Sequence, residues 1–546
     1  MDGKSPAYRT RSGLETKPHY DAPGGGGEAP GQFPFTRGRR GQAGGTWIQR
    51  ELSGEGDAEH SNAQIQYLIS KGQTGIDVIG DSPTQAMIDP DHPVAREAVG
   101  TQGVSLCRKE DYLALFRDLP FERISISSSA PPVMTLAGLM LSARERNFPI
   151  GKLRGSIIQA PLYAEDCCYA VRLPVGFRVR MALDTIEFCT AHMPKFHAYL
   201  EDTYFFSESG LTPVEEMALG FVQIRHLTRR LMARGMPVDS FAPRIAILLN
   251  CGTEFFEEIA KIRATRRLFA KMMRDEFGAR DPRSLAVVIT SHTSGLSLTA
   301  QQPANNVVRG SLQALSLVLA GVQAMEISAF DEAFRTPSRE AHLVGLRTQQ
   351  IIDLETGAGK VADPLGGSYF VEALTDEMEQ RIRARVDEIE AAGDIERLCD
   401  EGYFKAVFHS AMEQSQHLVE TGDLPVVGVN IHRIPDEEDT LLRDISEKKI
   451  APHTEHVERI VAFKAGRDKA ALAAALGRVR EAAAGTENLV PVVTDAIDAG
   501  VTAGEIADQI LVEAKPPKDA ALPGGNGLSF DWRLIAKRRW PIPMML

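Results

Sequence analysis

Residues 245–294 read IAILLNCGTEFFEEIAKIRATRRLFAKMMRDEFGARDPRSLAVVITSHTS, and this stretch decides the fold class. It holds a short apolar run at Ile245–Leu249, then Glu254–Phe277 with apolar residues at helical spacing, then a second apolar run at Leu285–Thr290. A strand, a helix and a strand in this order predict a βαβ unit with parallel strands.

The same alternation continues on both sides of this stretch. Val214–Ala233 is a further amphipathic segment, and four more short runs are strand candidates: Gly75–Ile79, Arg123–Ser127, Gly155–Gln159 and Ala324–Ser328. Repetition of this unit from about residue 60 to about residue 425 favours a closed (β/α)₈ TIM barrel over an open six-stranded sheet. No Gly-x-Gly-x-x-Gly motif supports a nucleotide-binding Rossmann fold.

We expect the barrel, residues 36–433, to lie between two appended segments. Residues 1–35 are polar and rich in glycine, which predicts an extended arm that is either disordered or laid across a partner. Pro425–Asn430 resembles a last strand, and residues 434–546 predict a helical extension, with helices at Val457–Ala484 and Thr502–Leu511. Two tryptophans near the end dock either on a partner or on the barrel: Trp532 and Trp540.

Composition excludes several classes of protein. The net charge of -12, with no dominant basic stripe, argues against a nucleic-acid surface. No apolar run is long enough to cross a bilayer. The six cysteines form no Cys-x-x-Cys pair and predict free thiols in a reducing cytoplasm. No His, Asp or Glu cluster has metal-ligand spacing, so we expect no metal site and no unrelated metal-dependent barrel such as an aldolase.

The strand candidates carry small hydroxylated residues where barrel interiors usually hold Val, Ile and Leu. These residues belong either to strand-end loops or to a tunnel for a long polar ligand. They are Ser125, Ser127, Ser128, Ser129, Ser156, Thr290, Ser291, Thr293 and Ser294.

A set of motifs in fixed order resembles a known family. The motifs are Pro34-Phe35-Thr36-Arg37-Gly38, Phe241-Ala242-Pro243-Arg244, Phe255-Phe256-Glu257-Glu258, Thr293-Ser294-Gly295, Ser297-Leu298-Thr299-Ala300-Gln301, Asn305-Asn306-Val307-Val308-Arg309, Asp363-Pro364, Gly367-Ser368-Tyr369 and Gly428-Val429-Asn430. Across residues 33–433 they resemble methylmalonyl-CoA mutase and its relatives. The resemblance implies an intramolecular transferase whose barrel axis is threaded by the pantetheine arm of an acyl-CoA, with adenosylcobalamin as cofactor.

The resemblance also implies partners. Single-chain members carry a cobalamin domain with an Asp-x-His-x-x-Gly motif, which this sequence lacks. We therefore expect the large subunit of a split enzyme that needs a small cobalamin-binding subunit with that motif. A heterotetramer of two large and two small subunits and a G-protein chaperone are further implied.

Two departures from the family concern the substrate carboxylate. The family tyrosine that binds it is replaced by Gly44 or Gly45, and the family arginine by Cys168. Without a guanidinium to pair with it, a free carboxylate loses its strongest fixed partner. The sequence therefore predicts a neutral, roomier pocket and a substrate other than methylmalonyl-CoA.

Two further departures concern polar groups near the reacting carbon. Tyr204 matches a family tyrosine, but Phe205 replaces the histidine that bonds the thioester carbonyl. Another group must replace it or the substrate differs, and four residues are candidates: Tyr163, Tyr169, His197 and His292. Asp81 stands for a family histidine and predicts either a polar group facing a substrate hydroxyl or amine, or a helix cap.

Other site residues are retained. Arg37 matches an arginine that contacts the CoA phosphates, and Ser127 and Ser156 are expected along the pantetheine. Gln323 and Glu355 are expected on the adenosyl side and Glu208 near the corrin. The losses at the acyl pocket leave an alternative: a catalytically degenerate paralogue that binds acyl-CoA or a partner without turnover.

Overall fold

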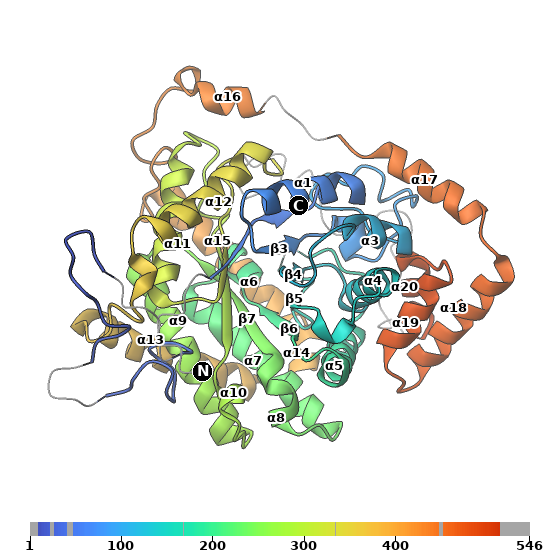
Figure 1. The fold of residues 1–546 in the computed structure, drawn as a ribbon, viewed down its shortest axis with the longest axis horizontal. Helices are drawn as coiled ribbons and strands as arrows, with labels where there is room; N and C mark the ends of the chain where they lie inside the picture. The colour runs from blue at the N-terminus through green and yellow to red at the C-terminus, as the bar shows by residue number, and fades with distance from the viewer. Residues whose placement is uncertain are drawn as a thin grey trace.

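The strands form one parallel sheet that closes on itself (Figure 1). Nine strands pair in the order β1-β9-β8-β7-β6-β5-β4-β3-β2, and every pair is parallel. The first two strands are halves of one extended segment on either side of Glu51, and β1 pairs with β9 while β2 pairs with β3. The strands are β1 (Ile48–Arg50), β2 (Leu52–Ser53), β3 (Gly75–Val78), β4 (Ser125–Ser128), β5 (Gly155–Gln159), β6 (Phe196–Asp202), β7 (Ile245–Cys251), β8 (Val288–Thr293) and β9 (Ala324–Glu326).

A helix follows each strand of the barrel and covers its outside. The covering helices are α1 (Ala58–Ser70), α3 (Lys109–Leu115), α4 (Pro132–Glu145), α5 (Val175–His192), α7 (Pro213–Ala233), α9 (Phe255–Lys271), α11 (Asn305–Ala320) and α12 (Arg339–Leu354). The architecture is therefore the (β/α)₈ barrel that the alternation predicted. This computed structural model describes residues 9–21, 27–40, 47–167, 169–333, 335–446 and 451–513.

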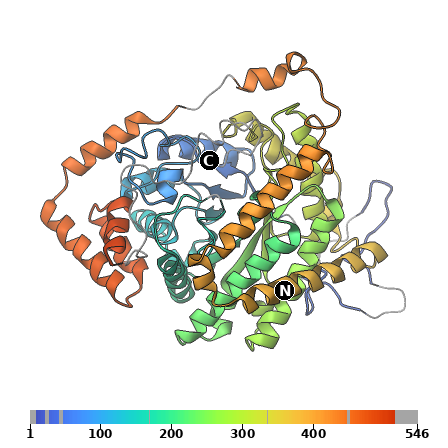
Figure 2. The same cartoon turned by 180° about the vertical axis from the view of Figure 1, so that it is seen from behind.

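Further helices complete the loops and the back of the barrel (Figure 2). They are α2 (Ser82–Gln85), α6 (Tyr204–Glu208), α8 (Val238–Phe241), α10 (Pro282–Leu285), α13 (Tyr369–Ala392), α14 (Ile395–Asp400), α15 (Tyr403–Thr421) and α16 (Thr440–Ser446), of which α13 and α15 are long. No helix in the described ranges is both long and apolar enough to span a membrane.

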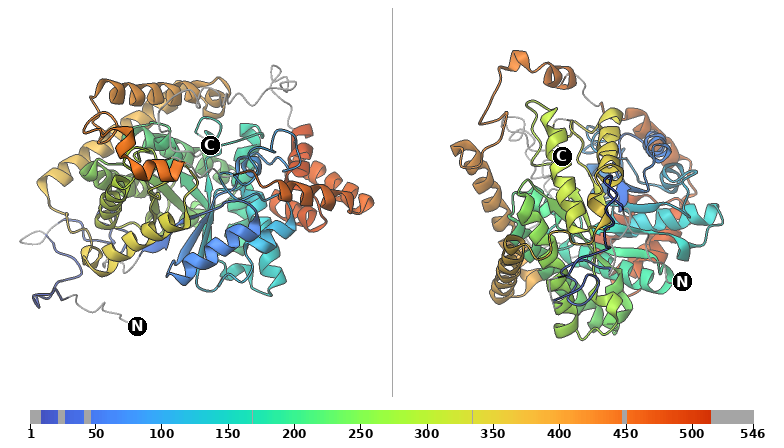
Figure 3. Two further views of the ribbon diagram at one scale, coloured as in Figure 1. Left: turned by 90° about the horizontal axis from the view of Figure 1, so that it is seen from above. Right: turned by 60° about the vertical axis from the view of Figure 1, so that its left-hand side comes forward.

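Four helices near the carboxyl end, α17 (Thr454–Ala465), α18 (Lys469–Ala484), α19 (Leu489–Asp498) and α20 (Ala503–Glu513), lie at one side of the barrel (Figures 1 and 3). Asp184 in α5 joins them to the barrel, because its carboxylate accepts from Leu489 N and its carbonyl from Asn488. The predicted helical segment exists, but Asp468 caps the start of α18 and divides the first helix in two. The assignment of residues 1–35, 36–433 and 434–546 to separate units stays a prediction.

One strand prediction was wrong, the bounds of another were shifted, and three of the nine strands were missed. Pro425–Asn430 is not a strand: Gly428 has φ +88°, and Asn430 donates to Val419 O and Leu424 O in a folded turn. Leu285 ends the short helix α10, and β8 begins at Val288. No local pattern indicated β6, whose last residues are the charged Glu201 and Asp202, or the split strand β1–β2.

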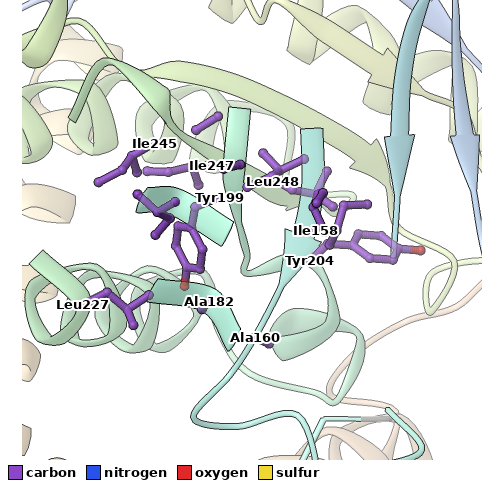
Figure 4. Packing of buried hydrophobic residues seen from close by; sticks show 14 of the residues in the cluster. Ile158, Ala160, Ala182, Tyr199, Tyr204, Leu227, Ile245, Ile247 and Leu248 are labelled. Carbon is purple, nitrogen blue, oxygen red and sulfur yellow. The ribbon is translucent and has the colours of Figure 1, made fainter. Parts of the chain in front are cut away.

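Side chains of β6 and of the turn after it point to opposite sides of the sheet, some toward the barrel axis and some toward the outer helices (Figure 4). Tyr199 points toward Ala182 and Leu227 of the surrounding helices, and its hydroxyl donates to Glu201 at 2.6 Å. Tyr204 points the other way, and its ring lies edge-on to His292 with 4.9 Å between ring centroids. Tyr204 is therefore on the side where the polar residues of the axis gather.

Candidate active site

A cavity of about 450 Å³ occupies the amino-terminal half of the barrel axis. Its wall contains the inward side chains near the starts of the strands, among them Ser125, Ser156 and Thr290. Other predicted hydroxyl groups face away from it: Ser291 donates to Leu249 O, and Thr293 accepts from Ser328 N. The hydroxylated strands thus line a real axial cavity, though only part of the predicted set does so.

Basic side chains surround the amino-terminal mouth of this cavity. Arg39, Arg40, Arg154 and Lys195 line it, and within the described part of the chain none of the four pairs with a carboxylate. Arg37 also lines the cavity, but its guanidinium is occupied by Asp363 at 2.8 Å and Asp21 at 3.2 Å. The sequence predicted that Arg37 contacts the CoA phosphates. Among the described residues, however, the cations of this mouth that pair with no carboxylate are Arg39, Arg40, Arg154 and Lys195.

An ionic layer crosses the axis above the cavity. Arg50 Nη1 lies 4.0 Å from Asp77 Oδ2, and the same oxygen is 3.2 Å from His292 Nε2. His292 Nε2 lies 3.5 Å from Glu326 Oε2. Burial raises the pKa of Glu326 well above its usual value, and the charges of nearby carboxylates raise it further. We call Arg50, Asp77, His292 and Glu326 the axial layer.

The axial layer contains a group of possible metal ligands that spacing along the sequence did not indicate. The ligand atoms of Asp77, His292 and Glu326 lie within 4.8 Å of one another, so they could hold a metal ion. They come from β3, β8 and β9, which are far apart in sequence. β8 pairs with β9, and the split strand β1–β2 joins β9 to β3 where the sheet closes. Sequence spacing cannot reveal such a group, since each strand contributes one residue.

An aromatic and acidic group lies where β6 ends, at the carboxyl end of the barrel. Phe205 packs edge-on against Tyr169, with 4.7 Å between ring centroids, and also contacts Tyr204. Tyr169 donates to Asp202 Oδ2 at 2.5 Å. Burial raises the pKa of Asp202 to about 7, although the bonds from Tyr169 and from Phe205 N oppose this rise.

Only one of the four candidates for the missing thioester donor lies on the axis beside Tyr204. Tyr163 packs against Phe206 and Phe404. Tyr169 is bound to Asp202, and His197 lies in the wall of the cavity near Arg244 O. His292 contacts the Tyr204 ring, and its Nδ1 is buried with no partner among the described residues.

A second polar group converges on Gly295 after β8. A side chain built at Gly295 would place its Cβ 3.0 Å from Glu208 Oε2, 3.4 Å from the Tyr204 hydroxyl and 3.5 Å from Glu332 Oε1. Glu208 accepts from Ser294 at 2.7 Å and from Leu296 N at 2.7 Å. Burial raises the pKa of Glu208 to about 7 and that of Glu332 to about 8.

Asp81 adopts the helix-cap alternative. Oδ1 accepts from Thr84 N at 2.8 Å, which caps α2, and Oδ2 accepts from Gly100 N at 2.8 Å. Burial raises the pKa of Asp81 to about 6. Backbone N–H groups thus engage both oxygens of Asp81, as a helix cap requires.

The three residues expected at the cofactor do not come together. Gln323 lies at the start of β9 and lines the axial cavity, where it accepts from Ile289 N. Glu355 caps the end of α12 and is exposed, whereas Glu208 is buried at the opposite end of the barrel. The two expected substitutions at Gly44 and Cys168 lie outside the described residues.

Comparison with known proteins identifies the family of this chain. Residues 9–515 match the methylmalonyl-CoA mutase family. The chain is 35% identical over 490 residues to the 2-hydroxyisobutanoyl-CoA mutase large subunit of Aquincola tertiaricarbonis, covering 88% of this chain and 86% of that one. It is 34% identical to methylmalonyl-CoA mutase of Cereibacter sphaeroides, covering 93% and 73% of the two chains. For the mitochondrial methylmalonyl-CoA mutase of Homo sapiens the identity is 32%, covering 93% and 69%. The chain therefore belongs to the methylmalonyl-CoA mutase family, and it is an acyl-CoA mutase, an isomerase.

Proposed function

We propose that this chain is the large, substrate-binding subunit of an adenosylcobalamin-dependent carbon-skeleton mutase that acts on an acyl-CoA other than methylmalonyl-CoA. The axial cavity carries the proposal, because it joins a cationic mouth to a hydroxyl-lined interior. A relative named as a large subunit supports the division into two subunits.

The cavity suits a CoA thioester along its whole length. Arg39, Arg40, Arg154 and Lys195 offer cations to the phosphates at the mouth. Ser125 and Thr290 then supply hydroxyl groups to the amides of the pantetheine arm, and Thr290 Oγ1 is buried without a partner in the described residues. The thioester then lies toward the axial layer and Tyr204.

The carboxyl end suits the nucleoside part of the cofactor. The space that Gly295 leaves is bounded by the oxygens of Glu208, Tyr204 and Glu332, which accept hydrogen bonds from hydroxyl groups. Adenosylcobalamin, when bound, supplies the radical that takes a hydrogen atom from the substrate. The chain's own part is to hold the substrate and to keep water from the reacting carbon, for which the buried rings of Tyr204 and Phe205 are suited.

Charge around the acyl end disfavours a substrate carboxylate. Asp77, Asp202 and Glu326 are buried there, and Arg50 is the cation in contact with Asp77. A further carboxylate would be repelled by these groups rather than paired.

The remaining parts of the proposal concern partners. A small cobalamin-binding subunit with an Asp-x-His-x-x-Gly motif would cover the carboxyl end of the barrel, in an assembly of two large and two small subunits served by a G-protein chaperone. Cys107, Cys189, Cys251 and Cys399 are free thiols, which suits the cytoplasm.

Two measurements test the proposal. Isothermal titration of CoA into the chain should show binding that weakens with salt, and the double variant Arg40→Ala/Lys195→Ala should weaken it about tenfold or more. A matched control is Arg229→Ala/Arg230→Ala on the outer face of α7. With adenosylcobalamin and the small subunit, an acyl-CoA substrate should give a cob(II)alamin radical signal in EPR. CoA binding without that signal for every acyl-CoA tried would indicate the degenerate paralogue instead.

A further inference from the structure

The axial layer contains polar atoms that make no hydrogen bond in the described chain, although Glu326 Oε2 lies 3.5 Å from His292 Nε2. Glu326 is 3% exposed and His292 5% exposed, yet Glu326 Oε2 and His292 Nδ1 make no hydrogen bond. His292 Nε2 faces Asp77 Oδ2 at 3.2 Å, and donation of its hydrogen there leaves Nδ1 as an acceptor. Buried polar groups without partners are costly, and in native proteins a bound ligand is one common explanation.

These atoms lie directly beyond the end of the axial cavity. Thr290 and Ala324 line the cavity, and His292 and Glu326 stand two residues further along the same paired strands. Two residues of a strand advance roughly 6.6 Å along its direction. The ring of Tyr204 closes the far side of His292. The axial layer therefore occupies the place where the acyl group of a bound thioester ends.

The charge of the layer selects the kind of group that fits. Asp77 and Glu326 contribute two carboxyl groups, with Asp202 close enough to Asp77 for their charges to interact. Arg50 lies 4.0 Å from Asp77. A methyl group would leave Glu326 Oε2 and His292 Nδ1 unsatisfied, and a carboxylate would add repulsion. A group that donates hydrogen bonds removes both costs.

We propose that the axial layer recognises an acyl-CoA whose acyl group carries a hydrogen-bond-donating substituent, a hydroxyl or a protonated amine, held by Glu326 and His292. This inference rests on the proposed function and names its substrate class. A hydroxyl donates one hydrogen bond, whereas an ammonium group donates to both acceptors and also neutralises charge. The expectation of a polar substrate contact is thus transferred from Asp81 to His292 of β8 and Glu326 of β9.

The test uses propanoyl-CoAs that differ only in the group at carbon 2, which is methyl, hydroxyl, ammonium or carboxylate. Isothermal titration with the full-length chain, slightly below neutral pH, should give a donor-bearing thioester about tenfold or more tighter than the methyl compound. The carboxylate compound should bind most weakly. The ratio between the hydroxyl and ammonium compounds then decides which donor the layer prefers.

Two variants test whether the axial layer causes the preference for a donor-bearing thioester. In Glu326→Gln the ratio of donor to methyl affinity should fall toward one, and His292→Phe should lower it as well. The matched control is Glu201→Gln, since Glu201 is equally buried but bonds Tyr199 and Gln223 on the outer side of β6. Its ratio should equal that of the unmodified chain. Circular dichroism melting of every variant shows that the chain is folded when titrated.

The outcomes separate this inference from the function beneath it. If neither CoA nor any thioester binds the chain, the proposed function is wrong and the inference with it. If all four thioesters bind equally, or the methyl compound binds tightest, only the inference is wrong. A donor preference that survives in both Glu326→Gln and His292→Phe would also overturn it.

Discussion

Tyr169 donates its hydroxyl hydrogen to Asp202 Oδ2 at 2.5 Å, while Asp202 Oδ1 accepts from the backbone of Phe205 at 3.3 Å. This arrangement ties the loop after β5 to the end of β6, at the carboxyl end of the barrel. It also buries a carboxyl group next to other carboxyl groups, so its ionisation opposes folding.

Asp202→Asn should therefore gain stability relative to the unmodified chain as pH rises. The pKa of Asp202 is about 7 in the folded chain, above its ordinary unfolded value, so the cost of ionising it appears above the unfolded pKa and grows until pH reaches about 7. The difference in unfolding free energy between the two proteins should grow by up to about 1.4 kcal/mol per pH unit in that window. Urea unfolding at a series of pH values measures it, and a difference independent of pH would refute the assignment.

Lys261→Met should destabilise the fold strongly. Lys261 is fully buried in α9 and lies 2.7 Å from Glu216 and 2.6 Å from Glu258. Burial lowers its pKa, but the two carboxylates outweigh burial and raise it, so the amine stays charged. Removing it should cost about 3–5 kcal/mol. Lys271→Met is the control, because Lys271 is 40% exposed and pairs only with Glu379. Similar losses for both variants in denaturant titrations would contradict the prediction.

Gly155→Ala should disrupt the barrel wall. A Cβ at the start of β5 would lie 1.8 Å from Ile126 O of the neighbouring strand, so the backbone must move. We expect a loss of about 2 kcal/mol or more in unfolding free energy. At Gly176, in the first turn of α5, a Cβ meets nothing within 4 Å, and Gly176→Ala should be neutral or slightly stabilising. Equal melting temperatures for the two variants would show that β5 tolerates the methyl group.

Arg37→Ala should release the arm more than it weakens CoA binding. Arg37 donates to Tyr20 O at 2.7 Å and to Asp363 at 2.8 Å, which joins the arm to the loop before α13. Limited proteolysis should cut the variant faster before residue 37. Its affinity for CoA should fall less than that of Arg40→Ala/Lys195→Ala, which removes unpaired charge. The opposite order of affinities would restore Arg37 as the phosphate ligand that its motif suggests.

The fold followed from local patterns wherever a strand was apolar. Ile245–Leu249 was recognised because buried parallel strands are often continuous apolar runs. β6 was not recognised because it contains the charged residues Glu201 and Asp202. Tyr199 and Gln223 donate hydrogen bonds to Glu201, and Tyr169 donates one to Asp202. Those partners are distant in sequence, so a local pattern cannot show them.

The candidate site, like the fold, could be predicted from the sequence only in part. Hydroxylated strands predicted a polar axis, and Ser125, Ser156 and Thr290 line its cavity. Sequence reasoning chose Arg37, whose charge the arm and Asp363 neutralise, and it offered Asp81, whose oxygens cap α2. Both choices depended on contacts that only a folded chain makes.

By itself the sequence determined the succession of strands and helices and the family, since both are carried by order and spacing along the chain. Tertiary structure alone decided which polar groups meet. Closing the sheet through the split strand β1–β2 brings Asp77 of β3 within hydrogen-bonding distance of His292 of β8 across the barrel axis. The reason is geometric, because each strand of a closed barrel points alternate side chains to a common axis, whatever their separation in sequence.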